Sequence, residues 1–382
     1  MFGSIPDYCS NVMRVLHGPV NVGNQPWVLS RHERALGVKS DLVVNYNTWL
    51  QYPVDRCLSS VGERSRRTRF RRFLFAAAAP LRYDVLHYYF GRSFLCWDDV
   101  GPRNRLWFMD LRLARALGRK VFMTLQGCDV RLSDASAARN EVTPCHEGEC
   151  QAAPTCRSVL DAERRFLIER VLPRVDRVFV LNPELAHFVP GAQFLPYASV
   201  DVRAFEPTWP RTDRPAVIVH APSDPSIKGS RYIAAAISRL ERRYPIEYVE
   251  VKGVPHEKAL QIYRNADLII DQALAGWYGG LAVEAMAMGK PVACYLRDAD
   301  LDVIPPAMRA ELPLIRIHPR TIEADLAAAL DMRARWPEIG RQARQFVERW
   351  HDPRQLAAAM VSAYRDPRSR FVLSPGPASC AA

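Results

Sequence analysis

The sequence predicts an α/β protein with two doubly wound domains that face each other across a cleft. Short apolar runs alternate with helical patterns through most of the chain, and this alternation is typical of parallel sheets covered by helices. The chain has 382 residues, which is too long for one ordinary hydrophobic core. We therefore expect two domains of about 150 to 200 residues each, with ligands at the carboxyl ends of the strands.

The first half of the chain contains the elements of one such domain. A helix is expected from Pro26 to Gly37, with Asn24 or Gln25 as its cap, because proline is favoured at the first helical position and glycine just after the end. Further helices are expected in an arginine-rich segment, at 107–118 and at about 157–172. Strands are expected at 12–18, 41–46, 84–91, 120–127 and 177–182. The first domain is predicted to cover residues 1–205.

The second half repeats this alternation after a proline-rich, polar linker at 194–215. It predicts a second domain at 206–340, followed by a C-terminal helix at 341–365. We expect the remaining residues, 366–382, to be disordered. Strands of the second domain are expected at 216–222, 247–253, 267–272 and 291–295.

The composition favours a soluble globular protein, since 48% of the residues are hydrophobic and 24% are charged. The longest apolar run, at 73–81, is half as long as a membrane span requires. The first residues lack the basic start and the apolar stretch of a signal peptide. We therefore expect a cytoplasmic protein whose nine cysteines are mostly reduced thiols or metal ligands.

The formal net charge is +11, and six arginines fall within residues 63–72, whereas the other basic residues are scattered with acidic residues between them. The chain has no zinc-finger spacing, no basic region that leads into heptads and no aromatic RNA-binding signature, so we expect no nucleic-acid partner. Residues 64–72 are predicted to form a basic patch for a membrane surface or an anionic ligand. The alternative is a solvated helix face that contacts nothing.

The stretch GWYGGLAVEAMAMGKPV at 276–292 predicts an anion site. After the strand at 267–272, the chain passes through glycines and enters a helix near Leu281, so the amides of Gly279, Gly280 and Leu281 are expected to point into the cleft. Free amides at a helix start bind phosphate well. Glu284 lies about one turn further on, where its carboxylate is placed to bind the vicinal hydroxyls of a ribose.

Lys228 follows the first strand of the second domain, in HAPSDPSIKGSRYI at 220–233, and is expected to reach the same cleft. Together with the helix amides it would neutralise a diphosphate without a metal ion. The alternative for a lone lysine before a glycine is an exposed loop cation.

These motifs, in this order, resemble the GT-B glycosyltransferases, in particular the retaining enzymes of family 4. LPYASVD at 195–201 and GPVNVG at 18–23 are similar to further segments of that family. The resemblance covers roughly residues 13–365 and implies two Rossmann-like domains, with a last helix that crosses back to the first. It also implies a nucleotide-diphosphate-sugar donor bound by the C-terminal domain and an unidentified acceptor bound by the N-terminal one. Transfer would proceed with retention and would require no catalytic metal.

The resemblance and the strand-end positions together give a set of candidate site residues. Asp129, Lys228 and Glu284 are the candidate catalytic residues, and Asp271 and Gln272 are further candidates for contacts with the sugar. His87 has a core position as its alternative. The candidate donor-binding residues are Ser223, Lys228, Gly279, Gly280, Leu281 and Glu284, and the candidate sugar- and acceptor-binding residues are Gly23, Asn24, His87, Gln126, Asp129, Trp277 and Tyr278.

Three positions depart from the family pattern. Gly276 stands where the family has a second glutamate, Ser223 where it often has an arginine, and Gln126 where it often has a histidine. These departures keep two alternatives open. One is a nucleotide-sugar-binding protein that serves a partner enzyme, and the other is a nucleotide-sugar epimerase.

Four cysteines suggest a tentative structural zinc site. Cys145, Cys150 and Cys156 lie within twelve residues, and Cys128 lies upstream of them. Their spacing is wider than in a zinc knuckle, so free thiols are the first alternative. An iron–sulfur cluster is a second alternative.

Overall fold

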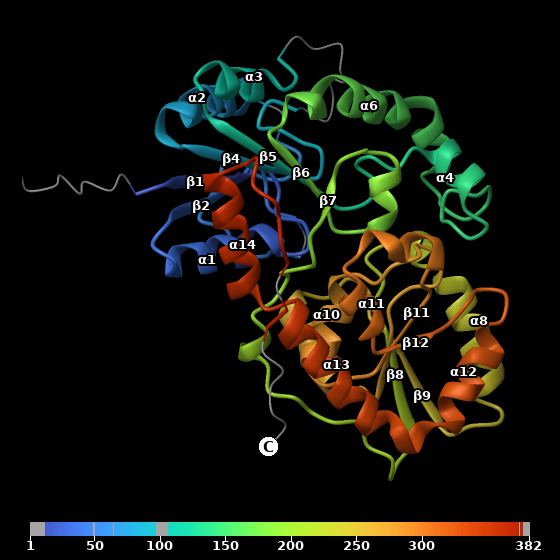
Figure 1. The fold of residues 1–382 in the computed structure, drawn as a ribbon. Coiled ribbons are helices and arrows are strands. Elements are labelled where there is room, and N and C mark those ends of the chain that lie inside the picture. Colours follow the sequence, from blue (N-terminus) through green and yellow to red (C-terminus); the bar gives the residue numbers. More distant parts are fainter. Residues whose placement is uncertain (1–11, 49, 64, 97–105, 374, 377–382) are drawn as a thin grey trace, which may run out of the picture.

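The computed structural model describes residues 12–376, apart from residues 49, 64, 97–105 and 374, and shows two α/β domains joined by two chain crossings (Figure 1). Each domain contains one parallel sheet, of seven strands in the N-terminal domain and five in the C-terminal domain. The predicted fold class is therefore confirmed.

The N-terminal sheet has the strand order β3-β2-β1-β4-β5-β6-β7, and all of its neighbouring strands are parallel. The five expected strands are β1 (Arg14–Gly18), β2 (Lys39–Val44), β4 (Val85–Tyr89), β5 (Lys120–Leu125) and β6 (Arg177–Val180). The sequence did not predict the outer strands β3 (Arg56–Cys57) and β7 (Gln193–Phe194), because two residues are too few to form a pattern.

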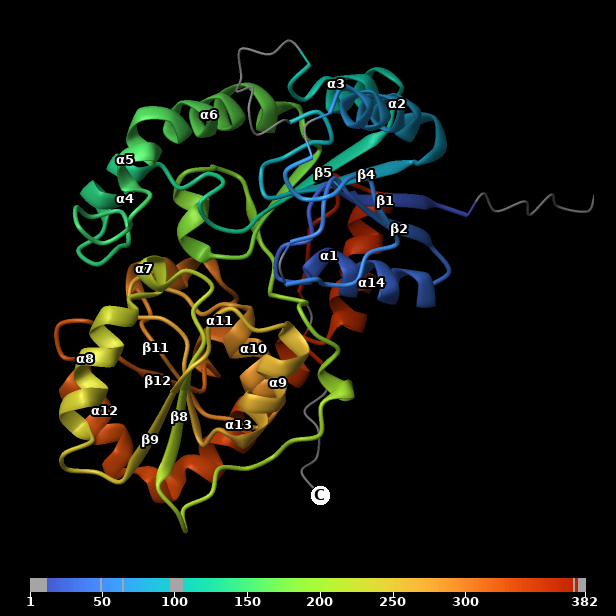
Figure 2. The ribbon, with the colours of Figure 1, turned by 180° about the vertical axis from the view of Figure 1, so that it is seen from behind.

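Helices cover both faces of this sheet (Figure 2). The helix α1 (Gln25–Ala35) covers one face, whereas α2 (Arg66–Arg82) and α3 (Met109–Ala116) cover the face that points away from the C-terminal domain. Asn24 precedes α1 in a left-handed conformation, and its side chain makes no capping hydrogen bond, so the expected cap is not formed. Other helical segments are α4 (Ser133–Arg139), α5 (Ala153–Thr155) and α6 (Asp161–Phe166), with wider π turns at Cys156–Leu160 and Leu167–Val171 and 3-10 turns at Leu172–Arg174 and Pro183–His187.

The C-terminal sheet has the strand order β12-β11-β10-β8-β9. Four strands lie where the sequence predicts them, whereas the three-residue outer strand β12 (Leu314–Arg316) was not predicted. The other strands are β8 (Ala216–His220), β9 (Ile246–Glu250), β10 (Leu268–Ile270) and β11 (Val292–Cys294). The helices are α7 (Pro225–Lys228), α8 (Ser230–Leu240), α9 (His256–Asn265), α10 (Gly280–Ala287), α11 (Pro306–Ala310) and α12 (Ile322–Asp331), and 3-10 turns lie at Val202–Ala204, Asp298–Val303 and Arg333–Arg335.

The C-terminal helical region returns to the N-terminal domain through its last helix. The helix α13 (Trp336–Trp350) packs against α10, and after a bend at His351 the helix α14 (Pro353–Arg365) packs against α1. His351 is buried at the bend, where its Nδ1 lies 2.7 Å from the carbonyl oxygen of Tyr197. The crossing helix is thus α14 alone and begins at residue 353.

Residues after α14, for which the sequence predicts disorder, lie against the protein as far as they are described. The guanidinium of Arg177 donates a hydrogen bond to the carbonyl oxygen of Pro367 at 2.6 Å. The ring of Phe371 packs on Phe179 with 4.8 Å between the ring centroids. Residues 374 and 377–382 lie outside the described part of the chain.

A close contact between two glycines gives a prediction on stability. A Cβ atom on Gly340 of α13 would overlap the carbonyl oxygen of Gly289. Alanine normally stabilises a helix by about 1 kcal/mol relative to glycine. For Gly340→Ala we expect the opposite, a decrease of about 1 to 3 kcal/mol in the free energy of unfolding, because α13 must move away from α10. Urea unfolding measures the change.

Gln342→Ala is the matched control, because Gln342 lies exposed on the same helix. We expect this variant to change the free energy of unfolding by less than about 0.5 kcal/mol. Equal stability of the two variants would contradict the contact between α13 and Gly289.

Candidate functional site

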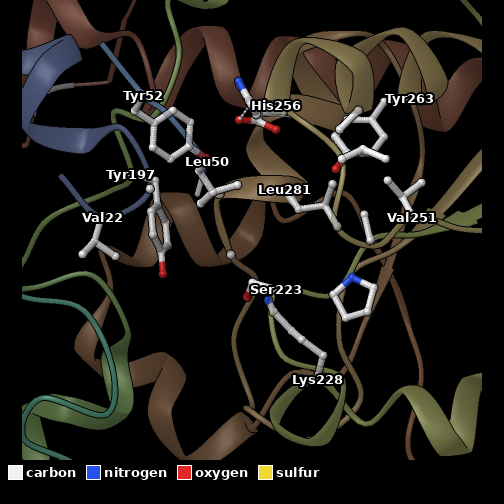
Figure 3. Close-up of a pocket in the computed structure, with 18 of the residues that line it drawn as sticks. Val22, Leu50, Tyr52, Tyr197, Ser223, Lys228, Val251, His256, Tyr263 and Leu281 are labelled. Atoms are coloured by element: carbon white, nitrogen blue, oxygen red, sulfur yellow. Dashed lines mark hydrogen bonds and ion pairs between the residues drawn. The ribbon is translucent and has the colours of Figure 1, made fainter. Parts of the chain in front are cut away.

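A cavity of about 300 Å³ lies between the two domains (Figure 3). Its walls come from loops that follow strands of both sheets and from the helices α9 and α10, which is the position expected for a ligand in such folds. The N-terminal domain contributes Val22, Gly23, Leu50, Tyr52, Gln126 and Tyr197. The C-terminal domain contributes Ala221, Pro222, Ser223, Lys228, Val251, Gly253, Val254, His256, Ala259, Tyr263, Gly279, Gly280, Leu281 and Glu284.

The cation and the glycine turn lie together, as the sequence predicts, but a third residue joins them. Asp271, which follows β10, is fully buried, and its carboxylate binds the ammonium of Lys228 at 3.0 Å and the amide of Gly279 at 2.5 Å. The amide of Gly279 is therefore not available to a ligand, contrary to our expectation. Within the described residues, the amides of Gly280 and Leu281 donate no hydrogen bond. These two amides, at the first turn of α10, are therefore available to a ligand.

Asp271 holds the cation in place and does not contact the cavity. Because its oxygens are occupied by Lys228 and the Gly279 amide, the expected contact with a sugar is not available to it. Gln272 is also buried. A buried carboxylate requires such partners, since an unpaired one costs several kcal/mol. We therefore assign Asp271 the role of positioning Lys228 at the carboxyl end of β8.

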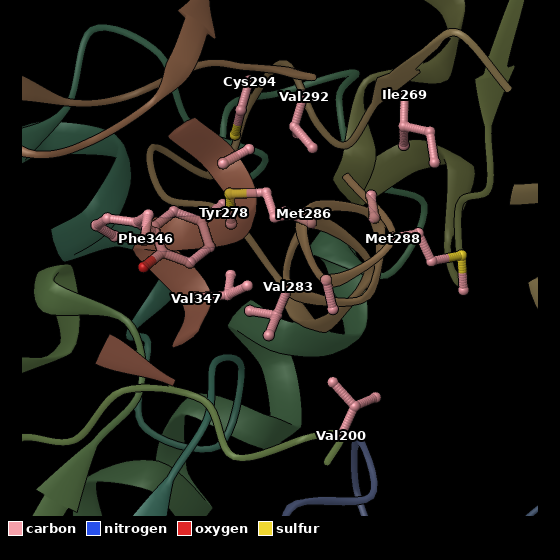
Figure 4. Packing of buried hydrophobic residues seen from close by; sticks show 14 of the residues in the cluster. Val200, Ile269, Tyr278, Val283, Met286, Met288, Val292, Cys294, Phe346 and Val347 are labelled. Carbon is pink, nitrogen blue, oxygen red and sulfur yellow. The ribbon is translucent and has the colours of Figure 1, made fainter. Parts of the chain in front are cut away.

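Glu284 is anchored by the apolar residues around it. Figure 4 shows Val283 and Met286 of α10 packed among Tyr278, Phe346 and Val347. A helix that is apolar on nearly all sides is normally buried in a core. Glu284 is its one acidic residue and reaches the cavity wall.

His256, at the start of α9, is the partner of Glu284. Its Nε2 lies 2.7 Å from a carboxylate oxygen of Glu284, the contact drawn as a dashed line in Figure 3. Burial acts to lower the pKa of His256, but the hydrogen bond to Glu284 and the charge of that carboxylate outweigh it and raise the pKa above 6.5. The ring of Tyr52, from the N-terminal domain, packs edge-on against the imidazole with 5.0 Å between the ring centroids. The carboxylate of Glu284 thus has a partner within the protein.

Gly276 has a left-handed backbone with φ of 76°. A Cβ atom here would lie 2.8 Å from the guanidinium carbon of Arg297. The buried Arg297 binds Asp300 at 2.7 Å and donates a hydrogen bond to the carbonyl oxygen of Val142, in the N-terminal domain, at 2.7 Å. A cation that joins the two domains therefore occupies the space next to Gly276.

Trp277 and Tyr278 lie in the core and do not line the cavity. Their exposed fractions are 1% and 0%, and the hydroxyl of Tyr278 lies 2.9 Å from Nε2 of His351. The indole of Trp277 packs edge-on against Phe194. We assign both rings a packing role in place of the expected contact with a sugar.

His87 is also a core residue, which was the alternative for it. Its Nδ1 lies 2.6 Å from the hydroxyl of Tyr364, on α14, and its Nε2 lies 2.7 Å from the hydroxyl of Thr124. Burial, with a smaller effect of the nearby His17, holds the pKa of His87 well below 6.5. A neutral imidazole between two hydroxyls explains this residue without a substrate.

Asp129 closes the turn after β5. Its two oxygens accept hydrogen bonds from the amides of Gln126 at 2.9 Å and Gly127 at 2.8 Å. Burial raises the pKa of Asp129, although these hydrogen bonds act in the opposite direction. The side chain lines a second cavity of about 140 Å³, with Trp107 and Arg164, and is absent from the wall of the larger one. The geometry gives Asp129 a structural role in place of the catalytic one that we expected.

The remaining predicted residues of the N-terminal side lie at or near the larger cavity. Gly23 and Gln126 line it, and the side-chain amide of Asn24 donates a hydrogen bond to the carbonyl oxygen of Ser199 at 3.2 Å. In the described structure, the side-chain oxygens of Gln126, Asn24 and Ser199 are buried without a hydrogen-bond partner. Buried polar atoms are normally paired, so these oxygens indicate a place for water or a polar ligand.

The four cysteines give no support to a metal site. Among the described residues, no group of three or more histidine, cysteine, aspartate or glutamate side chains is arranged to hold a metal ion. The sulfur of Cys128 lies 3.5 Å from the guanidinium of Arg131, and that of Cys156 lies 3.4 Å from Arg164. All four are free cysteines.

Sequence reasoning missed several residues of the cavity wall. Leu50 and Tyr52 belong to the loop after β2, which has no motif. His256 and Tyr263 belong to α9, whose sequence predicts only a helix. The position of His256 directly after the loop that follows β9 was the one available indication, since loops at these strand ends border the ligand site.

Comparison with known proteins relates the whole chain to one fold. The sequence matches no family model and no curated protein. Its structure is similar to a sucrose-phosphate synthase from Thermosynechococcus elongatus (14% identity, 93% of this chain and 99% of that one, TM-score 0.54). It is also similar to a glycosyltransferase from Rickettsia africae (13% identity, 93% and 98%, TM-score 0.58). A third similar structure is Anabaena Alr3699/HepE in complex with UDP and glucose (10% identity, 92% and 99%, TM-score 0.57).

These similarities, together with the two parallel sheets, show that the chain has the GT-B fold with two Rossmann-like domains. They extend over both domains, because more than nine-tenths of the chain is covered in each comparison.

The contact of Gly276 with Arg297 gives a second stability prediction. A non-glycine residue in a left-handed conformation costs about 1 to 2 kcal/mol. Gly276→Ala must also displace the guanidinium of Arg297, so we expect it to lower the free energy of unfolding by at least about 2 kcal/mol. Gly118→Ala is the control, because Gly118 has a similar φ of 69° but has nothing within 4 Å of its Cβ position. Equal losses in urea unfolding would show that Arg297 does not fill this space.

The pair of His256 and Glu284 gives a pH prediction. The folded-state pKa of His256 is raised above 6.5 by Glu284. The stabilisation of the folded protein by this pair is therefore complete below pH 6.5 and is lost as the pH rises through the raised pKa. We expect His256→Gln to lower the free energy of unfolding by up to about 1 kcal/mol below pH 6.5 and by less at higher pH. Thermal unfolding across this pH range measures the difference.

In a Glu284→Gln background, the same histidine substitution should lose its pH dependence, because the charge that raises the pKa is gone. A pH dependence that persists in that background would assign the effect to another partner of His256.

Proposed function

We propose that the protein is a glycosyltransferase that moves a sugar from a nucleotide-diphosphate-sugar donor to an acceptor bound by the N-terminal domain. One observation carries this proposal: Glu284, the free amides of Gly280 and Leu281, and Lys228 line a single cavity. A carboxylate suits the hydroxyls of a ribose, and the amides and the ammonium suit the diphosphate attached to it.

The known structures with the same fold are consistent with this assignment. One of them contains UDP and glucose, and the names of the other two describe a glycosyltransferase and a sucrose-phosphate synthase. The identities of 10 to 14% make the fold the common feature, so the proposal for this chain depends on its own cavity residues.

The proposed reaction breaks the bond between the anomeric carbon and the diphosphate and forms a bond from that carbon to the acceptor oxygen. The negative charge that develops on the departing diphosphate is stabilised by Lys228 and the amides of Gly280 and Leu281. The acceptor hydroxyl loses its proton to an oxygen of that diphosphate on the same face of the sugar, so the configuration is retained. The protein therefore needs no side chain as a general base and no catalytic metal ion.

The acceptor is proposed to bind at the N-terminal side of the cavity. Gly23 and Gln126 line this side, and the unpaired oxygens of Gln126, Asn24 and Ser199 offer hydrogen-bond acceptors. A substrate that carries several hydroxyl groups would donate hydrogen bonds to these oxygens.

A second candidate function includes binding of the nucleotide sugar but no transfer of the sugar. In this reading the protein binds a nucleotide sugar and serves a partner enzyme. The contact of Gly276 with Arg297 favours it, because no carboxylate is present at the position where related enzymes have a second glutamate.

Incubation with a panel of nucleotide sugars distinguishes these functions. A transferase releases nucleoside diphosphate faster when a suitable acceptor is added. A binding protein is stabilised against heat by one of the donors without turnover, and an epimerase yields a new isomer of the sugar. No binding and no turnover with any donor would refute the donor site.

Glu284→Ala tests the ribose contact directly. The loss of hydrogen bonds to a charged group costs about 1.5 to 3 kcal/mol, so we expect at least about tenfold weaker binding of the donor by isothermal calorimetry. Glu257→Ala is the matched control, because Glu257 is exposed on α9 and lies outside the cavity wall. An unchanged affinity of Glu284→Ala would overturn the assignment of this residue.

A further inference from the structure

The outer face of α2 has an unusual composition for a water-exposed surface. Phe70, Leu74 and Leu81 are 63%, 51% and 68% exposed. Their spacing of four and seven residues places them on one stripe of the helix. Single exposed apolar residues are common on protein surfaces, whereas a row of large ones is typical of a binding surface.

Arginines flank this stripe. Arg66, Arg67 and Arg71 are exposed, and in the described part of the chain no ion pair joins them to a carboxylate. The helix itself contains no acidic residue. The acidic residue at its start, Glu63, is hydrogen-bonded to Ser60 and to Thr68, and the charge of Arg71 also acts on its carboxylate, so it offsets part of the arginine charge at the helix N-terminus. The exposed face of α2 is therefore both apolar and positively charged.

The arginine-rich segment 64–72 is thus divided into two parts. Arg72 turns inward, where its guanidinium donates a hydrogen bond to the hydroxyl of Ser59 at 2.7 Å. Residue 64 lies outside the described residues. The outward face that remains consists of Arg66, Arg67 and Arg71 together with the three apolar side chains.

The outer face of α2 takes little part in the packing of the N-terminal domain. The helix begins at a Ser65 cap and buries its opposite face, including Thr68, Ala76 and Ala79, and it packs against α3. The exposed Phe70, Leu74 and Leu81 contribute little to that packing, so their presence points to a partner outside the chain.

The combination of charges and apolar side chains favours an anionic membrane surface. Arginines bind lipid phosphates, and large apolar side chains enter the boundary between headgroups and acyl chains. A nucleic acid would use the arginines but would leave the row of Phe70, Leu74 and Leu81 in water. No helix among the described residues is long and apolar enough to cross a membrane, so the contact would be at the surface.

We propose that α2 is a membrane-surface helix that binds anionic phospholipid through Phe70, Leu74 and Leu81 and the arginines beside them. The helix lies on the face of the N-terminal domain that points away from the C-terminal domain (Figures 1 and 2). Docking through this face therefore leaves the cavity between the domains accessible. The proposal goes beyond the transfer reaction and does not depend on it.

Vesicle co-sedimentation of the full chain tests the proposal, with phosphatidylcholine vesicles that contain or lack phosphatidylserine. We expect the protein to bind only the anionic vesicles. Each arginine near such a surface contributes about a fivefold factor in binding, so Arg66→Gln/Arg67→Gln/Arg71→Gln should weaken binding by at least about tenfold. Phe70→Ser/Leu74→Ser should abolish the part of the binding that resists high salt, because insertion of apolar side chains is not screened.

Arg239→Gln/Arg242→Gln/Arg243→Gln is the matched control. It removes the same number of charges from exposed positions of the C-terminal domain, and we expect vesicle binding to remain within about twofold. Thermal unfolding of all variants identifies any that fail to fold, and the affinity for the nucleotide sugar should be unchanged in each.

Three results would overturn the proposal. One is a lack of binding to anionic vesicles by the wild-type chain. Another is an equal loss of binding in the C-terminal control. The third is tighter binding to a DNA or RNA duplex than to vesicles, with no effect of Phe70→Ser/Leu74→Ser, which would assign the arginines to nucleic acid.

Discussion

The ion pair of the buried carboxylate of Asp271 with Lys228 is the interaction on which the C-terminal side of the cavity depends. Asp271 follows β10, binds Lys228 at the end of α7, and accepts a hydrogen bond from the amide of Gly279 at the start of α10. Three segments that are distant in the sequence are thereby fixed at one sheet edge. Because the charge of Asp271 is buried, any rearrangement that separates it from Lys228 would leave it unpaired at a cost of several kcal/mol. The cation is therefore held in position by the protein, and in the proposed function a diphosphate would share Lys228 with Asp271.

The two sides of the cavity differ in how firmly they are built. On the C-terminal side, α10 is enclosed by the core that it shares with α13, so the position of Glu284 is set by close packing. On the N-terminal side, Gly23, Leu50 and Tyr52 belong to loops, and several nearby polar oxygens have no partner in the described structure. Loops vary more readily than packed helices. This difference is consistent with the proposed function, in which the C-terminal half binds the donor and the N-terminal half binds the acceptor.

The sequence predicted what local patterns determine and missed what distant contacts determine. Most strands were predicted because apolar runs and helices alternate, whereas the outer strands β3 and β7 have only two residues and form no pattern. The outer strand β12 was missed although it is as long as the predicted strands β10 and β11. Lys228 and Glu284 line the cavity, and each lies in a segment that leads from the carboxyl end of a strand into a helix. The interpretation failed for Trp277 and Tyr278, since a glycine-rich turn reads as exposed while Gly276 directs the following rings into the core. Asp129 was predicted to be catalytic because the sequence shows no partner for its charge, but its carboxylate accepts hydrogen bonds from the amides of Gln126 and Gly127.

Gly276 also shows how the loss of one side chain is coupled to a contact between the domains. Its missing Cβ leaves room for Arg297, which reaches Val142 of the N-terminal domain, and Arg139 of that domain binds Asp300 at 2.9 Å in return. Arg297 and Asp300 are both buried, so these contacts are more costly to break than exposed ion pairs. The packing of α14 on α1 joins the domains a second time. With two such connections, the width of the cavity is constrained by the protein itself, and a glutamate at position 276 would interfere with one of them. The glycine that stands in the sequence where the family has a second glutamate leaves room, in the folded chain, for the contact of Arg297 with the N-terminal domain.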